Sequence, residues 1–149
     1  QVYPYKKTQP GKEKIMIKRI VVGGIVAASM SPVVSWACTF NYQVYGNPSI
    51  KERIDERIAE KVTDEYCKKY NEKYQIVIIA SAFTSSKQSL GYATVGLRKR
   101  GTKDVPANNR SGYWVKDGNY AVGVAYDMAA STALDHIVDV MSDIPSFLN

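Results

Sequence analysis

An uncharged apolar segment at residues 20–34 divides this chain, so that only the residues after it are available for a folded domain. It follows a short basic stretch, residues 16–19, and it precedes Ser35 and Ala37, small residues at the two positions that a signal peptidase recognises. At roughly fifteen residues it is shorter than the about twenty apolar residues that a membrane-spanning helix needs. We therefore predict that residues 16–37 are a secretory signal peptide of a bacterial protein that is periplasmic or secreted.

Two alternatives to cleavage and release stay open at this segment. A permanent membrane anchor is one, although Gly23, Gly24 and Pro32 interrupt the apolar run. Lipidation of Cys38 is the other, although Ser35 stands where lipid-attachment motifs usually carry Leu. Both alternatives would keep the protein on a membrane, whereas cleavage after residue 37 leaves contact with the membrane only during export.

Residues 1–15 precede the first plausible initiator, Met16. Lys12 and Glu13 are encoded by purines only, and they lie just upstream of that methionine, as a bacterial ribosome-binding site would. We interpret residues 1–15 as translated leader that is not part of the native protein, and a genuine extended basic region is the alternative. Residues 38–149 then remain for the fold, a length that suits one small domain with one core.

Of the net charge of +6, the part before Cys38 contributes +5. Six of the 20 Lys and Arg residues and one of the 14 Asp and Glu residues lie there, which leaves 14 basic and 13 acidic residues in the rest. A near-neutral domain exerts no global attraction on nucleic acid. We therefore predict no nucleic-acid partner.

The chain has two cysteines, Cys38 and Cys67. In an oxidising compartment a lone pair most simply forms one disulfide, which we predict here. With one histidine and no Cys-x-x-Cys spacing, no metal site and no cofactor are expected.

Periodicity predicts an α+β domain with the element order α-β-β-β-β-α. A capping box at Ser49 and Glu52 begins a predicted amphipathic helix that ends near Lys73. Two strands follow, at residues 74–83 and 88–98, and a polar loop of about 13 residues covers 100–112.

The last part of the chain predicts a hairpin and then a helix. Residues 113–116 and 119–126 flank Asp117-Gly118, a strong signal for a two-residue turn. Apolar residues at helical spacing then run from residue 127 to Pro145. The predicted architecture is an antiparallel sheet of about four strands, with an N-terminal and a C-terminal helix packed on it.

On the predicted hairpin, small residues alternate with large ones, so one sheet face would be aromatic. Such a patch is a candidate interaction site if both helices pack on the other face, and core if one helix covers each face. The residues predicted to bind at this patch are Tyr113, Trp114, Tyr120, Val122 and Tyr126.

Basic residues gather around the long loop, close to Tyr92 and to the predicted hairpin. They could bind an anion or nucleic acid, and the alternative is a solvated loop whose charges protect a sheet edge. This basic loop consists of Arg98, Lys99, Arg100, Lys103 and Arg110.

His136 and Asp139 are the only residues that suggest catalysis, because an imidazole and a carboxylate three residues apart share a helix face. No nucleophile motif accompanies them, so no catalytic residue is assigned and an enzyme is the less favoured class. We predict a small exported protein-binding module, such as an inhibitor, an immunity-type protein or an assembly protein, with another protein or a second copy as partner. A small exported hydrolase centred on His136 and Asp139 is the alternative.

Overall fold

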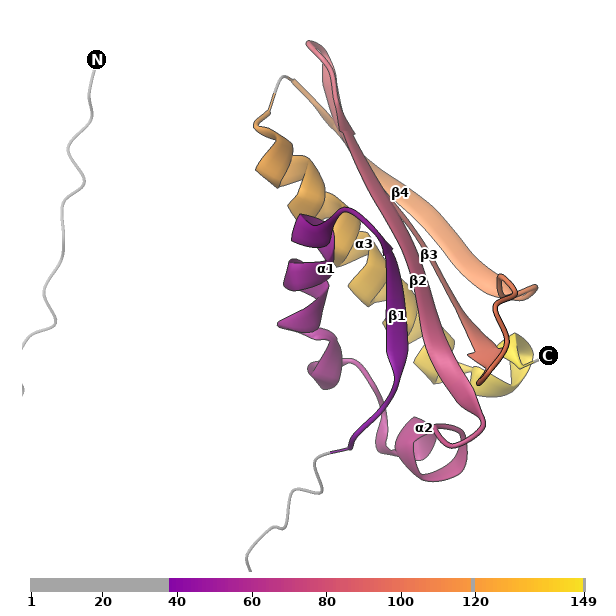
Figure 1. Cartoon of the computed structure of the whole chain (residues 1–149). Helices are drawn as coiled ribbons and strands as arrows, with labels where there is room; N and C mark the ends of the chain where they lie inside the picture. Colours follow the sequence, from indigo (N-terminus) through magenta and orange to yellow (C-terminus); the bar gives the residue numbers. More distant parts are fainter. Residues whose placement is uncertain (1–37, 119, 149) are drawn as a thin grey trace, which may run out of the picture. The chain divides into compact units, whose positions relative to one another are not determined.

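The computed structural model describes residues 38–118 and 120–148, so the leader and the signal segment predicted within residues 1–37 lie outside it. The domain combines a four-stranded sheet with helices (Figure 1). Its elements, in chain order, are β1 (Tyr42–Gly46), α1 (Pro48–Asp55), η1 (Ile58–Glu60), α2 (Asp64–Lys69), β2 (Tyr74–Thr84), β3 (Gln88–Lys99), β4 (Asn109–Asp117), α3 (Val122–Ser142) and η2 (Ile144–Phe147).

The sheet is mixed, with the spatial order β1-β2-β3-β4. Strands β2, β3 and β4 pair antiparallel, and β1 pairs parallel with β2. A parallel neighbour requires a crossover connection, which the segment from α1 to α2 provides. The broad α+β prediction is confirmed, and so are the strands beginning at Tyr74 and Gln88. The purely antiparallel sheet is wrong, because β1 was not foreseen.

The helix predicted from Ser49 to Lys73 is divided into α1, η1 and α2. The N-cap of α1 is Asn47, whose side chain accepts a hydrogen bond from the backbone N–H of Ser49 at 2.9 Å. The hydroxyl of Thr63 caps α2 in the same way, and it accepts from the N–H of Tyr66 at 3.3 Å. The predicted start is therefore displaced by two residues, and a second cap restarts the helix.

The division of this helix follows from its apolar spacing. Ile50, Ile54 and Ile58 recur every fourth residue, so on a continuous helix of 3.6 residues per turn they would wind away from the sheet. With the breaks in place, all three are buried, and Tyr66 on α2 reaches the same core. Burial of four large apolar side chains thus outweighs the continuity of one helix.

The hairpin predicted at Asp117-Gly118 is not formed. Residues 113–116 lie in β4, but residues 122–126 lie in the first turns of α3 and not in a strand. The N–H of Gly118 donates to the carbonyl oxygen of Lys87 at 2.6 Å, so the chain closes against the β2–β3 turn before it enters the helix. The final helix therefore begins five residues before the predicted start at 127.

Small residues explain why α3 is a helix that packs closely on the sheet. Ala125, Ala129 and Ala133 are fully buried along its inner side. Opposite them, a Cβ atom added at Gly91 would stand 2.2 Å from the backbone nitrogen of Ala129. The alternation of small residues that resembled a strand is the contact surface of a helix.

Helices α1 and α3 lie on the same side of the sheet, with α2 at one end (Figure 1). The core fills the space between these helices and the inner sheet face, and no helix of the described residues covers the other face. None of these helices has the length and apolarity that crossing a bilayer requires. Inner-face residues of the core are Ile76, Ile78, Ala80, Ala93, Val95 and Leu97.

Candidate functional site

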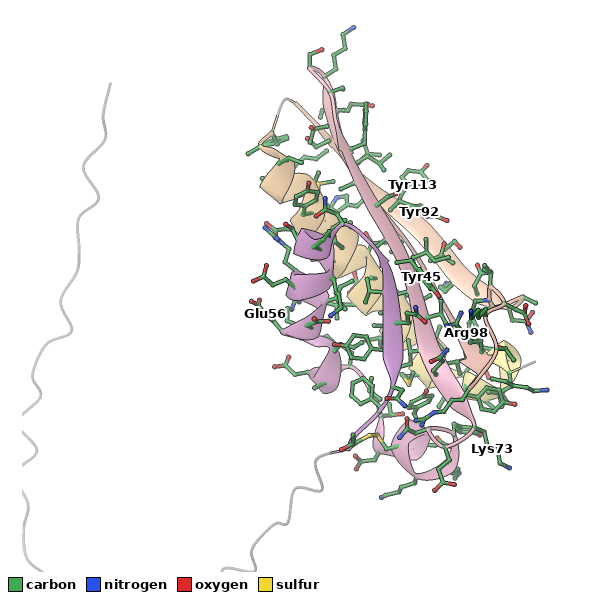
Figure 2. The ribbon with its side chains drawn as sticks, viewed as in Figure 1. Tyr45, Glu56, Lys73, Tyr92, Arg98 and Tyr113 are labelled. Atoms are coloured by element: carbon green, nitrogen blue, oxygen red, sulfur yellow. A yellow bond between two sulfur atoms is a disulfide. The ribbon has the colours of Figure 1, made fainter. Side chains whose placement is uncertain are left out.

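The helix-free sheet face differs in chemistry from the inner face. Side chains alternate along each strand, so the partners of the core residues point away from the helices. Tyr45, Tyr92, Arg98 and Tyr113 lie along this side of the sheet, whereas Glu56 lies on the helical side (Figure 2). We call this surface the open face. From the alternation and the register it comprises Gln43, Tyr45, Gln75, Val77, Ile79, Ser81, Phe83, Leu90, Tyr92, Thr94, Gly96, Arg98, Asn109, Ser111, Tyr113 and Val115.

Two tyrosines lie side by side on the β3–β4 half of the open face. Tyr92 on β3 and Tyr113 on β4 are direct cross-strand partners. Tyr113 is 70 % exposed, and Phe83, toward the turn end of β2, is 63 % exposed. Aromatic rings that stand on a rigid sheet offer flat surfaces for stacking, at little cost in side-chain entropy.

A chain of hydrogen bonds runs beside these rings. The hydroxyls of Tyr92 and Thr94 are 2.5 Å apart, and the hydroxyl of Thr94 is 2.8 Å from that of Ser111. Ser111 in turn donates to the side-chain oxygen of Asn109 at 2.8 Å. These hydrogen bonds hold the side chains in position. A hydroxyl can act as a donor or as an acceptor toward a ligand.

Arg98 lies at the other end of the open face and is only 6 % exposed. Its guanidinium donates to the side-chain oxygen of Gln43 at 2.5 Å, and more weakly to the hydroxyl of Tyr45 and the carbonyl oxygen of Asp104, both at 3.4 Å. With its amide oxygen turned toward Arg98, Gln75 accepts from Nε and Nη2 at 2.5 and 2.8 Å. All these acceptors are neutral, so the charge is solvated by the protein but not neutralised.

The five residues predicted as one aromatic patch are divided by the structure. Tyr113 lies on the open face, and its neighbour Trp114 points to the helical side of β4, where it is 55 % exposed. Lys116 contacts the ring of Tyr120, with Nζ 4.3 Å from the centroid. The remaining two predicted residues, Val122 and Tyr126, lie on α3.

The basic loop is also divided. Arg98 and Lys103 line a common pocket on the open face. Arg110 points to the helical side and pairs with Asp139, with Nε and Oδ2 3.1 Å apart. The remaining two members lie at the end of β3, where Arg100 donates to the side-chain oxygen of Asn71 at 2.7 Å and Lys99 is exposed.

His136 does not stand in an open polar pocket. Its side chain is mostly buried between α3 and β4, close to Gly112, and Nδ1 is 3.6 Å from the carboxylate of Asp139. Neither ring nitrogen has a hydrogen-bond partner within the described residues. Asp139 is engaged by Arg110 instead, and nothing in this arrangement presents an activated nucleophile.

A disulfide joins Cys38 to Cys67 on α2, with their Cα atoms 5.9 Å apart (Figure 2). It ties the segment before β1 to the helical crossover, and its formation by the protein in solution stays a prediction. Across residues 38–118 and 120–148, no group of three His, Cys, Asp or Glu side chains is placed to hold a metal ion.

The open face could have been found in part from the sequence. Phe40, Tyr42 and Val44 alternate with Gln43 and Tyr45, which is the period-2 pattern of a strand. This pattern was missed because it lies close to the cysteine and β1 is only five residues long. Without β1, neither Tyr45 nor Gln43 could be placed beside Arg98.

The chain was compared with known families, curated proteins and solved structures. No family model and no curated protein matches it. A ribosomal subunit interface protein from Coxiella burnetii matches with a TM-score of 0.37 and 11% identity, over 72% of this chain and 99% of that one. The N-terminal domain of Protein Y from Thermus thermophilus matches with a TM-score of 0.33 and 12% identity, over 68% of this chain and 98% of that one.

These neighbours correct several sequence-based predictions. The first is named for an interface of ribosomal subunits, which conflicts with an exported protein-binding module and with an exported hydrolase. Judged by this finding, the signal-peptide interpretation, the periplasmic or secreted location and the exclusion of nucleic acid are wrong. The segment boundaries at residues 15 and 37 are untested. At TM-scores below 0.5 the likeness assigns no function to this chain.

Proposed function

We propose that residues 38–148 form a non-catalytic domain that binds single-stranded RNA on the open face. The observation that carries the proposal is the cross-strand pair of Tyr92 and Tyr113, on a helix-free face whose other end holds Arg98 and Lys103. A four-stranded sheet that stacks unpaired bases on its aromatic side chains is a recurring mode of RNA recognition. Each stacked base contributes about 1–3 kcal/mol.

The hydrogen-bond chain beside the rings favours RNA over DNA. Tyr92 and Ser111 carry hydroxyls beside the stacking surface, and the hydroxyl of the buried Thr94 lies between them. A ribose 2′-hydroxyl can both donate to and accept from such groups, and this is the contact by which proteins distinguish RNA from DNA. We therefore expect weaker binding of DNA with the same sequence.

The electrostatic contribution is local. The domain is nearly neutral after residue 37, and Arg98 and Lys103 are the cations that the open face brings together. For single strands the logarithm of the affinity falls with the logarithm of the salt concentration, with a slope of about −0.7 for each phosphate that is neutralised. Two such contacts predict a slope of about −1.4, and stacking supplies the rest of the affinity.

The test is fluorescence anisotropy of a labelled RNA 12-mer titrated with the full chain. The expected result is saturable binding, weaker binding of the matching DNA strand, and little binding of duplex RNA, whose bases are not free to stack. Ribosomal subunits are included as a further RNA probe, a choice suggested only by the name of one structural neighbour.

Two results would overturn this proposal. The first is the absence of saturable binding to any single-stranded RNA at low salt. The second is equal affinity for single-stranded and duplex RNA, because that would indicate attraction to phosphates without base stacking.

A further inference from the structure

A pocket of about 260 Å³ opens on the cationic end of the open face. The loop between β3 and β4 forms one of its walls, and the strands form its floor. This volume is below the roughly 300–1,000 Å³ of sites that enclose a drug-sized ligand, so the pocket suits one small group. Its lining residues are Tyr45, Val77, Ile79, Arg98, Lys103 and Val105.

Arg98 supplies a buried positive charge to this pocket. No carboxylate pairs with it among the described residues, and its partners are amide, hydroxyl and carbonyl oxygens. A buried charge without an opposite charge is costly, because neutral dipoles replace only part of the lost hydration. An anion held at this site would supply the missing charge.

Lys103 supplies a second cation, and no ion pair engages it within the described ranges. The lining contains no acidic side chain. Two cations without an acid in one small pocket favour a group with more than one negative oxygen, such as a phosphate.

The rest of the lining is apolar and aromatic. On β2, Ile79 is partly exposed and Val77 is buried; Val105 is an exposed apolar residue of the loop, and Tyr45 is 41 % exposed. The centroid of that ring is 6.0 Å from the guanidinium carbon of Arg98, so the ring is held beside the charge. A bare phosphate would leave this apolar surface unused, whereas a nucleobase would cover it.

We infer that this pocket binds one nucleotide, with its base against Tyr45, Ile79 and Val105 and its phosphate beside Arg98 and Lys103. The inference rests on the proposed function, because it makes the pocket the position on the open face where one residue of the RNA is held. The aromatic pair at Tyr92 and Tyr113 would stack other bases and is not part of the pocket.

The test is titration of the full chain with adenosine 5′-monophosphate, adenosine and inorganic phosphate, followed by nuclear magnetic resonance of the protein amides. The monophosphate should bind at least tenfold more tightly than adenosine or phosphate alone, and the perturbed amides should lie around the pocket. Lys103→Gln should weaken the monophosphate at least threefold without lowering thermal stability, because Lys103 is exposed. Lys87→Gln, an equal loss of charge at the β2–β3 turn, should leave the affinity unchanged.

The outcomes separate this inference from the proposed function. If RNA binds but the monophosphate perturbs no pocket amide, the pocket inference is wrong and the RNA-binding proposal stands. If phosphate binds as tightly as the monophosphate, the pocket is a simple anion site and the inference also fails. Weaker RNA binding in Tyr113→Ala, with the affinity for the monophosphate unchanged, would support both.

Discussion

The two faces of the sheet use the same strands for different purposes. On the inner face, Ile78, Val95 and Leu97 are almost fully excluded from water, and Gly91 lets a helix approach. On the open face, tyrosines, an arginine and hydroxyl groups alternate with them residue by residue. Substitutions at neighbouring positions of one strand should therefore have different effects. A substitution on the inner face should lower stability, and one on the open face should lower RNA affinity.

The largest effect on stability is expected from Leu97→Ala on the inner face of β3. Leu97 is fully buried in the core between the sheet and the helices. Such truncations remove buried surface and leave a cavity, and they typically cost about 2–5 kcal/mol in the free energy of unfolding. Urea unfolding measures this cost, and RNA affinity of the folded protein should not change. A cost below about 1 kcal/mol would show that the inner face is not the core.

Removal of the disulfide should lower the free energy of unfolding nearly as much as truncation of a core side chain. Bonding between positions separated by 29 residues restricts the unfolded chain, which is worth about 2–4 kcal/mol on a model-dependent estimate. The double variant Cys38→Ala and Cys67→Ala should lose this amount in urea unfolding. Labelling of denatured, unreduced protein should detect no free thiol. Two reactive thiols in freshly purified protein would contradict the prediction.

Gly91→Ala tests how closely α3 approaches the sheet. The added methyl group would meet the backbone of Ala129 and Met128, so the helix must shift. Overpacking of this kind typically costs about 1–3 kcal/mol. Thermal unfolding measures the loss, and Ser81→Ala on the exposed side of β2 is the control that should cost almost nothing. Equal stability of both variants would contradict the predicted difference between the two faces.

A smaller, pH-dependent effect is expected from the contact between β1 and α1. Burial raises the pKa of Tyr42 to about 12, with a contribution from its 2.6 Å hydrogen bond to Asp55. For Asp55, burial acts to raise the pKa, but the hydrogen bonds from Lys51 and Tyr42 outweigh it, so the pKa is lowered. A lowered pKa stabilises the fold above the ordinary carboxyl pKa of about 4, and this stabilisation is lost as the pH falls.

Asp55→Asn should therefore destabilise the domain at pH 7 and have less effect at pH 3. Because the pair with Lys51 is partly exposed, the loss should stay below about 1 kcal/mol. Urea unfolding of both proteins at the two pH values measures the difference. The opposite trend, a larger loss at pH 3, would show that the protonated carboxyl is the stabilising form.

Local patterns identified the central part of the fold. The strands predicted to begin at Tyr74 and at Gln88 are correct. In both, the local preference of the side chains for a strand coincides with burial in the core. The pattern failed between residues 120 and 126, where alternating valine and tyrosine indicated a strand. Packing of Ala125 and Ala129 on the sheet outweighed that local preference.

The candidate site was predictable only in part. Arg98, Lys103 and Tyr113 were singled out from the sequence, but the contacts that make them a site depend on long-range pairing. Tyr45 reaches Arg98 across 53 residues, through a parallel strand that a local pattern does not reveal. Trp114 was included with Tyr113 among the predicted binding residues, but adjacent residues of a strand point to opposite faces, and β4 separates the two in this way.

Tyr113 and Trp114 provide the most direct test of the central claim, that the open face binds RNA. They are adjacent aromatic residues on β4, both largely exposed, and they point to opposite sides of the sheet. In anisotropy titrations with the RNA 12-mer, Tyr113→Ala should weaken binding at least fivefold, the loss of one stacked base. Trp114→Ala should change it less than twofold. An unchanged affinity in Tyr113→Ala, or a greater loss in Trp114→Ala, would contradict the assignment of RNA binding to the open face.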